Sequence, residues 1–376
     1  MPAHRSESLV FTVVVSVIAL LAAIPIALLL ALSGEPGTLA LAAVLAFIPV
    51  GPLVAAYLWL DRYEPEPRSL LAAALAWGAF VATLGALVVQ GLGGFVAGFS
   101  EQASLAIVAP FAEEATKGLF LLLLLIWRRQ ELDGVLDGIV YAGMVGIGFA
   151  FTENILYLAA AYGGTSAEQP GGLGSLGATF VVRCLASPFA HPFFTAFFGI
   201  GVGLAIASTS RTVRWLAPVV GYLCAVGLHA AWNGSTLLAE GVGFFGVYFL
   251  VMAPLFALMI LLAVWVRSRE RLLLTAALDD ASRRGLIPAE DIPHVVDLGA
   301  RRRARRFAKQ RGGVHGVTLM RDYQQAAVEL GYLHHRVLRG TAPPKHVERG
   351  QRFVDQMHHA RGQIAFPVTP AGGHHR

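Results

Sequence analysis

Three ionisable side chains stand close together in an apolar stretch of this chain, in the run Phe111-Ala112-Glu113-Glu114-Ala115-Thr116-Lys117. A charged residue near the centre of a membrane helix costs roughly 2.5–3.5 kcal/mol on insertion scales. Glu113 and Lys117 are one helical turn apart and share a face, while Glu114 lies ~100° further round the helix. Such a group either locks helix packing as a buried ion pair or borders a functional cavity, and the cost of placing it there favours function.

Further polar groups occur in three other apolar stretches. They are Glu153 with Asn154, His191 with Thr195, and His229 with Asn233. Each histidine has its polar partner four residues later, on the same helical face. Of the chain's 12 histidines, only these two fall in apolar stretches. A single histidine in a membrane helix is as often a helix–helix hydrogen bond as a functional group.

The depth of these groups in the membrane favours a shared site. At a rise of 1.5 Å per residue, Glu113, Glu153, His229 and His191 lie ~12–20 Å from the outer ends of their helices. Independent packing contacts on four helices have no reason to agree in depth, whereas one site requires it. The sequence therefore predicts a site in the outer half of the membrane.

Several chemistries suit this set of residues. A carboxylate in a low-dielectric pocket can act as a general base on water, and His or Asn side chains can donate to an oxyanion. Two carboxylates and two imidazoles, Glu113, Glu153, His191 and His229, could equally hold a divalent metal, zinc if any. A proton relay in a transporter uses the same groups. A nucleophilic Cys184 or Ser187 is the weakest option, because no base is fixed beside either one by the sequence.

Composition sets the class of protein. Hydrophobic residues make up 56% of the 376 residues and charged residues only 14%, which indicates a polytopic helical membrane protein rather than a soluble one. Cys184 and Cys224 both lie in apolar runs and predict neither a disulfide framework nor a zinc motif. No phosphate-binding loop, HExxH motif or dinucleotide-binding glycine fingerprint is present in the sequence.

The apolar stretches predict an all-α bundle of about eight spans. We expect them near residues 9–32, 38–60, 69–98, 105–127, 135–161, 178–207, 213–239 and 243–266. The first exceeds a usual signal-peptide core, so a retained helix is favoured over cleavage near Ser33. Loops on one side carry no Lys or Arg, and those on the other carry several. Both termini are therefore expected in the cytoplasm. The protein itself is expected in the plasma membrane.

The charge distribution divides the chain near residue 266. Residues 1–266 hold 9 Lys or Arg against 14 Asp or Glu, and residues 267–376 hold 20 against 10. We expect a membrane domain over 1–266 and a basic, helical cytosolic region over 267–376, with the last ten or so residues disordered. The run Arg301-Arg302-Arg303-Ala304-Arg305-Arg306 predicts contact with anionic lipid. Nucleic acid is not expected as a partner, because no recognition motif accompanies these charges.

Four motifs in order resemble the PrsW family of intramembrane proteases. They are Glu113-Glu114-x-x-Lys117, Phe149-x-x-x-Glu153, His191-x-x-x-Thr195 and His229-x-x-x-Asn233. The segment Asp61-Arg62-Tyr63-Glu64-Pro65-Glu66-Pro67 also resembles that family. The resemblance covers roughly residues 40–266, and each motif alone is weak. The family is grouped with the CAAX prenyl endopeptidases and bacteriocin-processing relatives, and is described both as metalloprotease-like and as glutamic-type.

The resemblance implies Glu113 as the residue that activates water, with Glu114 and Lys117 supporting it. It implies His229 and Asn233 as contacts to the oxyanion or substrate. The prenyl endopeptidases carry His where this chain has Glu153, so either Glu153 or His191 assists Glu113. The implied activity is that of an intramembrane endopeptidase acting on a membrane-anchored, single-span protein, such as an anti-sigma-factor-like regulator.

Two other functions remain open from the sequence. A proton-coupled transporter or channel would use the same cluster, although no internal repeat supports it. A catalytically inactive binding protein is the third reading. Metal content measured together with chelator sensitivity would discriminate best among the mechanisms.

Overall fold

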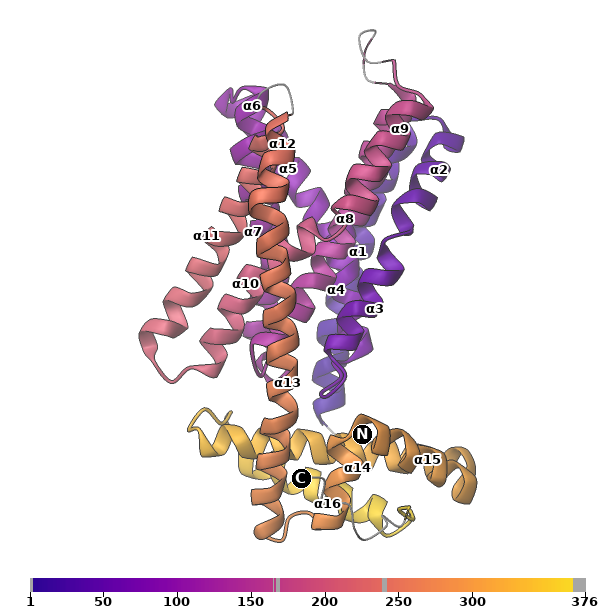
Figure 1. Cartoon of the computed structure of the whole chain (residues 1–376), viewed down its shortest axis with the longest axis vertical. Coiled ribbons are helices and arrows are strands. Elements are labelled where there is room, and N and C mark those ends of the chain that lie inside the picture. The colour runs from indigo at the N-terminus through magenta and orange to yellow at the C-terminus, as the bar shows by residue number, and fades with distance from the viewer. Residues whose placement is uncertain (1–2, 165, 167–169, 239–241, 368–376) are drawn as a thin grey trace. The chain divides into compact units, whose positions relative to one another are not determined.

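The computed structural model describes residues 3–164, 166, 170–238 and 242–367. Within these residues every regular element is a helix and no strand is present, which confirms the predicted all-α class. The chain forms two compact units (Figure 1). Unit 1 comprises Met1–Asp61 and Glu66–Ala263, and unit 2 comprises Arg62–Pro65 and Val264–Arg376.

Unit 1 is built from membrane-type helices. They are α1 (Ala3–Ser33), α2 (Pro36–Phe47), α3 (Val50–Leu60), α4 (Arg68–Ala76), α5 (Thr83–Ala97), α6 (Glu101–Ala103), α7 (Ala109–Trp127), α8 (Val135–Gly163), α9 (Leu173–Phe180), α10 (Ala190–Ala207), α11 (Arg211–Ser235), α12 (Val242–Val247) and the start of α13 (Ala253–Arg283). Among the residues that the structure describes, four π-helical turns extend these helices: η1 (Trp77–Ala82), η2 (Ser104–Val108), η4 (Val181–Ala186) and η6 (Tyr248–Met252). π-Helical turns are frequent at functional sites, and η4 bears on the site below.

Seven helical stretches among the described residues are long and apolar enough to cross a membrane. They cover residues 10–32, 36–60, 68–93, 135–163, 173–207, 211–235 and 242–283. The remaining expected span, at residues 105–127, corresponds to η2 and α7. Helix α7 carries three ionisable residues in 19 and is not among the seven. The chain is therefore a multi-pass helical membrane protein, and α7 alone contributes three charged residues.

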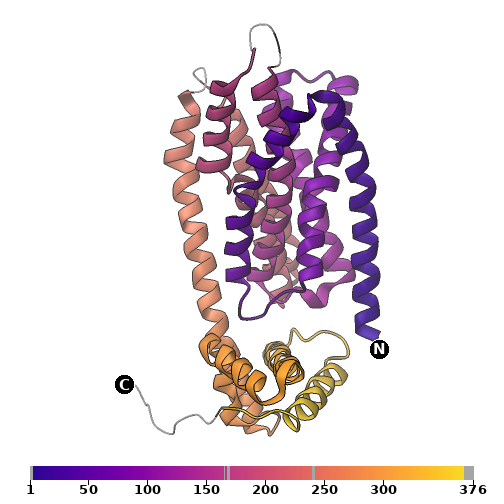
Figure 2. The ribbon, with the colours of Figure 1, turned by 90° about the vertical axis from the view of Figure 1, so that its right-hand side faces the viewer.

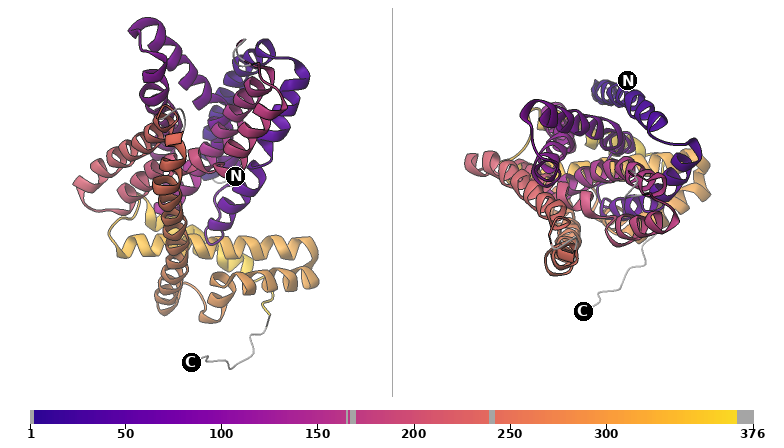
Figure 3. Two further views of the ribbon diagram at one scale, coloured as in Figure 1. Left: turned by 45° about the horizontal axis from the view of Figure 1, so that its top comes forward. Right: turned by 90° about the horizontal axis from the view of Figure 1, so that it is seen from above.

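Helix α8 is the most buried helix of unit 1 and packs against α2, α3, α4, η1 and α10. Glycines let it approach α10 closely. A Cβ on Gly138 would lie 2.0 Å from the carbonyl oxygen of Gly199, and one on Gly146 would lie 2.6 Å from Cα of Pro192. Small residues permit such backbone contact between membrane helices, and this contact brings Glu153 of α8 near His191 of α10. Helices α1 and α11 lie at the periphery of the bundle (Figure 3, right).

The expected continuous helix over residues 178–207 is interrupted in its middle. The π-turn η4 ends at Ala186, Ser187 leaves the helical conformation with φ −132° and ψ 36°, and α10 begins at Ala190. Proline disfavours the α conformation in the residue that precedes it, here Ser187 before Pro188. His191 therefore lies in the first turn of a new helix rather than in the middle of a long one. The expected span at 38–60 is divided into α2 and α3 at Pro49, although Ile48 before it keeps helical dihedral angles.

The acidic segment Asp61–Pro67 joins α3 to α4. Asp61 accepts a hydrogen bond from the backbone N–H of Glu66 at 2.8 Å, and Glu66 accepts one from the hydroxyl of Tyr141 at 2.7 Å. Burial raises the pKa of Asp61 to about 8 and raises the pKa of Glu66 well above its usual value. These contacts tie the connection between two spans to the central helix α8.

Unit 2 contains the end of α13, α14 (Ile292–Val296), α15 (Leu298–Leu338) and α16 (His346–Arg361). Figure 2 follows α13 as one helix that leaves unit 1 and enters unit 2. A hydrophobic core includes Leu278, Val295 and Ala327. Inside it, Asp291 accepts hydrogen bonds from the Tyr323 hydroxyl at 2.5 Å and from Arg361 Nε at 2.6 Å. The basic tail is thus a folded unit, and residues 368–376 of its predicted disordered end lie outside the described residues.

The loop of residues 62–65 belongs with the tail rather than with the membrane helices around it. Arg301 is buried, and its Nη1 donates to the carbonyl oxygens of Arg62 and Tyr63 at 3.2 and 3.1 Å. Arg301 was expected to be part of a lipid-binding run. Its side chain instead holds a loop, while its neighbours Arg302 and Arg303 are exposed.

Candidate active site

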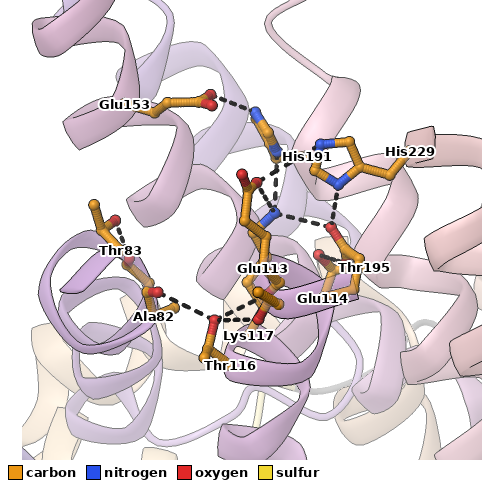
Figure 4. A network of polar contacts seen from close by, with 12 residues as sticks. Ala82, Thr83, Glu113, Glu114, Thr116, Lys117, Glu153, His191, Thr195 and His229 are labelled. Carbon is orange, nitrogen blue, oxygen red and sulfur yellow. Dashed lines mark hydrogen bonds and ion pairs between the residues drawn. The ribbon is translucent and has the colours of Figure 1, made fainter. Parts of the chain in front are cut away.

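Six ionisable side chains from four helices converge in unit 1 (Figure 4). They are Glu113, Glu114 and Lys117 of α7, Glu153 of α8, His191 of α10 and His229 of α11. Five of them are buried and Glu153 is partly buried. Asn233, the seventh candidate from the sequence, lies one turn beyond His229, and its Nδ2 donates to the carbonyl oxygen of Leu105 at 3.1 Å.

Lys117 lies at the centre of the cluster and is fully buried. Its Nζ lies 2.8 Å from Glu114 Oε1, 3.4 Å from Glu113 Oε2 and 3.1 Å from His191 Nδ1. It also lies 3.8 Å from the centroid of the Phe149 ring, a cation–π contact. An ammonium group has three donors, and all three are used here. The lysine therefore links both carboxylates of α7 to the imidazole of α10.

The two adjacent carboxylates of α7 differ in the number and length of the hydrogen bonds that they accept. Glu114 accepts from Lys117 Nζ at 2.8 Å, from His229 Nδ1 at 2.9 Å and from the Thr195 hydroxyl at 2.9 Å. Glu113 has only long contacts, at 3.4 Å to Lys117 Nζ, 3.4 Å to Gln90 Nε2 and 3.6 Å to His229 Nε2. Glu114 is thus held by short hydrogen bonds, and Glu113 is the carboxylate with capacity for a further ligand.

Both histidines give one ring nitrogen to a carboxylate. His191 Nε2 lies 2.7 Å from Glu153 Oε2, and His229 Nδ1 lies 2.9 Å from Glu114 Oε1. Because a carboxylate accepts, these nitrogens carry the protons in the neutral rings. The lone pairs are therefore on His191 Nδ1, which accepts from Lys117, and on His229 Nε2, on the side of Glu113.

Neighbouring elements hold α7 in its position. The indole Nε1 of Trp77 donates to the carbonyl oxygen of Thr116 at 3.0 Å, and the Thr116 hydroxyl lies 3.1 Å from the carbonyl oxygen of Ala82. Both contacts come from η1 and fix the turn of α7 that separates Glu113 from Lys117. The Phe149 ring packs against Lys117 and, at 5.0 Å between centroids, against His191. The aromatic residue of the second motif thus shields the cluster from one side.

Arg183, in the π-turn η4, is a member of the site that sequence reasoning missed. Its Nη2 donates to the same Glu153 oxygen that His191 contacts, and its Nε donates to Asn154 Oδ1 at 2.8 Å. Its guanidinium also lies 3.9 Å from the Tyr157 ring centroid. A signal was available, because Arg183 is a basic residue within a predicted span. Arginines there are rare and are usually paired.

The two weak nucleophile candidates are not placed for that role. The Ser187 hydroxyl donates to the carbonyl oxygen of Val182 at 2.7 Å. Cys184 is buried in a hydrophobic cluster with Ile155 and Leu158. Neither is bonded to a base, as an activated serine or cysteine would be.

A cavity of about 420 Å³ adjoins the cluster. Its polar lining includes His191, Arg183, Asn154, Asn233 and Thr236, and its apolar lining includes Leu105, Val182, Trp232 and Phe244. It is bordered by η2, α8, η4, α11 and α12, and α8 and α9 diverge from α12 in the upper part of Figure 1. The volume and mixed lining are typical of a ligand site.

Three residues could together hold a metal ion. One donor atom each from Glu113, His191 and His229 lies within 4.8 Å of the others. One carboxylate and two imidazoles are a donor set of catalytic zinc sites. The bonds from His191 to Glu153 and from His229 to Glu114 match the outer carboxylates that orient metal-bound histidines. Glu153, the fourth predicted ligand, is thus occupied as a partner of His191 and Arg183. The donor set fits a metal, provided that the Lys117 amine moves out of the space between the three residues.

Comparison with known proteins shows which family the chain belongs to. The model of the PrsW family, described as intramembrane metalloproteases, matches residues 66–259, about half of the chain. The chain belongs to the PrsW family. A protease PrsW from Geobacillus kaustophilus is 28% identical over 211 residues, covering 55% of this chain and 85% of that protein. A protease PrsW from Clostridioides difficile is 32% identical over 120 residues, covering 30% of this chain and 50% of that protein. No solved structure matches the chain.

The PrsW family match confirms the resemblance and the prediction of an intramembrane protease. It includes every residue of the cluster, Arg183 and the cavity lining. It excludes Asp61 and the whole of the basic tail. Family membership supports a protease over the proton-coupled transporter that the sequence left open.

Proposed function

We propose that this PrsW-family protease hydrolyses a peptide bond of a single-span membrane protein, with Glu113 as the general base. The single observation that carries this choice is the difference between Glu113 and Glu114. Glu114 accepts three hydrogen bonds of 2.8–2.9 Å, whereas Glu113 has contacts of 3.4 Å and longer. Of the two carboxylates, Glu113 has the greater capacity to accept a hydrogen bond from water.

In the proposed reaction, Glu113 takes a proton from water while the water oxygen attacks the carbonyl carbon of the substrate. The carbon–nitrogen bond of the tetrahedral intermediate then breaks, and Glu113 returns the proton to the leaving nitrogen. The positive charge of Lys117 offsets the repulsion between the carboxylates of Glu113 and Glu114 in a medium of low dielectric. Its contacts to both carboxylates, at 3.4 and 2.8 Å, support this role.

Oxyanion stabilisation is assigned to donors that line the cavity. In the tautomer above, His229 has no free N–H, because Nδ1–H is given to Glu114. Asn233 Nδ2 gives one hydrogen to Leu105 and has a second. Arg183 uses Nε and Nη2 and retains donors on Nη1. These two side chains, rather than His229, are proposed as donors to the oxyanion.

The cavity beside His191 is proposed to take the substrate segment. A membrane helix must unwind locally before water can reach its carbonyl carbon, and each freed backbone group then needs a partner. The amides, hydroxyls and guanidinium of the lining supply such partners beside His191, which contacts Lys117 of the cluster. If a divalent metal is bound, Glu113, His191 and His229 would hold it, and it would polarise the carbonyl and acidify water. Glu113 would then be a ligand rather than the base.

A cleavage assay tests this function. Purified protein is reconstituted in lipid vesicles with a single-span peptide that carries a helix-weakening Gly-Gly pair, moved stepwise along the span. We expect two fragments whose masses place the cut in the outer half of the membrane, with the highest rate when the glycines lie at that depth. Fragments cut at the opposite membrane surface, or no fragments at any position, would contradict the proposal.

Both termini are proposed to be cytoplasmic, on the basis of the arginine-rich loops. In that orientation, the exposed Arg302, Arg303 and Arg306 lie on the side of the anionic leaflet. Single cysteines at Ser166 and Ser210, in a background without Cys184 and Cys224, test this with a thiol reagent that does not cross membranes. We expect Ser166→Cys to label from outside intact cells and Ser210→Cys only after lysis. The reverse pattern would invert the topology and remove the lipid proposal for the tail.

A further inference from the structure

A second cavity, of about 400 Å³, lies where α7 and α10 end and α11 begins, and it is lined by three arginines. Arg129 follows the end of α7, and Arg211 and Arg214 lie in the first turn of α11. Leu125, Ala205, Ile206 and Trp215 complete the lining. No acidic side chain is among the lining residues, so the cavity is strongly cationic.

Two of these arginines are not engaged within the protein. The side chains of Arg211 and Arg214 have no hydrogen-bond or ion-pair partner among the described residues, and both residues are exposed. The first turn of α11 contains no acidic residue, and Ser210 forms no side-chain cap there. The backbone N–H groups of that turn therefore add positive potential at the same place.

The position of the cavity indicates which anion it meets. Arg211 begins a membrane helix and Arg129 lies two residues beyond Trp127, the last residue of α7. Trp127 and Trp215 are 58% and 79% exposed, as expected for aromatic residues at the membrane interface. The lining therefore lies at the depth of lipid headgroups, with Leu125, Ala205 and Ile206 providing an apolar floor.

We propose that this cavity binds the phosphate of an anionic phospholipid, with Arg211 and Arg214 as its principal ligands. A guanidinium donates two parallel hydrogen bonds to phosphate oxygens, which suits arginine better than lysine. Basic pockets between membrane helices are sites for anionic headgroups. The proposal is independent of the proteolytic mechanism, because none of the lining residues belongs to the catalytic cluster.

The test measures binding of phosphatidylglycerol and phosphatidylcholine to delipidated, detergent-solubilised protein by native mass spectrometry. Each basic residue near a headgroup contributes about fivefold in affinity, so Arg211→Gln/Arg214→Gln should weaken phosphatidylglycerol binding by roughly 25-fold. Arg211→Lys/Arg214→Lys should retain part of the affinity, because charge remains while the paired geometry is lost. Arg321→Gln/Arg352→Gln, two exposed residues of unit 2, removes the same charge elsewhere and should leave binding unchanged.

A second measurement needs no variant and remains available if the glutamine variants do not fold. An arginine-specific reagent is applied to wild-type protein in bilayer discs, and modified residues are identified by mass. Arg211 and Arg214 should be protected in phosphatidylglycerol discs and modified in phosphatidylcholine discs. Equal modification in both lipids, or equal loss of binding in the control pair, would overturn the proposal. Protection by inorganic phosphate alone, with no added effect of phosphatidylglycerol, would assign the site to a soluble phosphate and also overturn it.

Discussion

Replacing Glu113 with glutamine should lower the single-turnover cleavage rate by at least ~100-fold, the usual scale for loss of a general base. The amide keeps the shape of the side chain but cannot take a proton from water. Lys117 keeps its shorter contact to Glu114, at 2.8 Å against 3.4 Å to Glu113, so the helix should remain in place. The rate is measured in bilayer discs with excess enzyme, so that it reports the chemical step.

Two controls make this result specific. Substrate affinity, measured by fluorescence, should be unchanged in Glu113→Gln, because the proposed role belongs to the reaction and not to binding. Glu101→Gln removes an exposed carboxylate of the same chain and should retain wild-type activity. A Glu113→Gln protein that is correctly inserted and cleaves at near-normal rates would remove Glu113 from the mechanism.

Replacing Lys117 with methionine should have the largest effect on folding. The ammonium is fully buried between two carboxylates and an imidazole. Breaking a buried ion pair by removing one partner costs about 3–5 kcal/mol, since the other charge is left uncompensated. We expect a large fall in the thermal unfolding temperature of Lys117→Met, measured by intrinsic fluorescence in detergent.

The double variant Lys117→Met/Glu114→Gln identifies the cause. Glu114 makes the shortest contact with Lys117, so neutralising both should recover part of the stability that the single variant loses. Lys117→Met/Glu101→Gln is the matched control and should recover none. Additive losses in Lys117→Met/Glu114→Gln would show that the loss in the single variant does not come from the unpaired charge of Glu114.

The sequence could predict which residues share the site, because helical spacing and membrane depth constrain them. Glu113 and Lys117 are one turn apart on one helix, and the two histidines lie in apolar stretches, so convergence followed from the pattern. The difference between Glu113 and Glu114 could not be predicted. It depends on Thr195 and His229, which arrive from α10 and α11 and both bond Glu114.

Backbone irregularities account for most of the other features of the site that the sequence did not predict. The break at Ser187 and the π-turn η4 place Arg183 on the same Glu153 oxygen as His191. A uniform helix over residues 178–207 would not bring two side chains eight residues apart to one oxygen of another helix. The predicted span at 105–127 matches η2 and α7, although the charges of α7 lower the hydropathy that identifies a span.

The tail differs from expectation for a tertiary reason. Charge alone separated residues 267–376 from the membrane domain, but residues 62–65 belong to the same unit as the tail. The contacts of Arg301 with the Arg62 and Tyr63 carbonyl groups account for this. A contact between residues more than 200 positions apart leaves no periodicity in the sequence.

The most direct test of the central claim is a single-turnover cleavage in water enriched in oxygen-18, quenched with acid and analysed by intact mass. If Glu113 directs water at the substrate carbonyl, the new carboxyl terminus carries one heavy oxygen. The enzyme then has its unmodified mass at every time point. An enzyme whose mass transiently rises by that of the N-terminal fragment would show a covalent intermediate on a protein side chain, and would contradict the account.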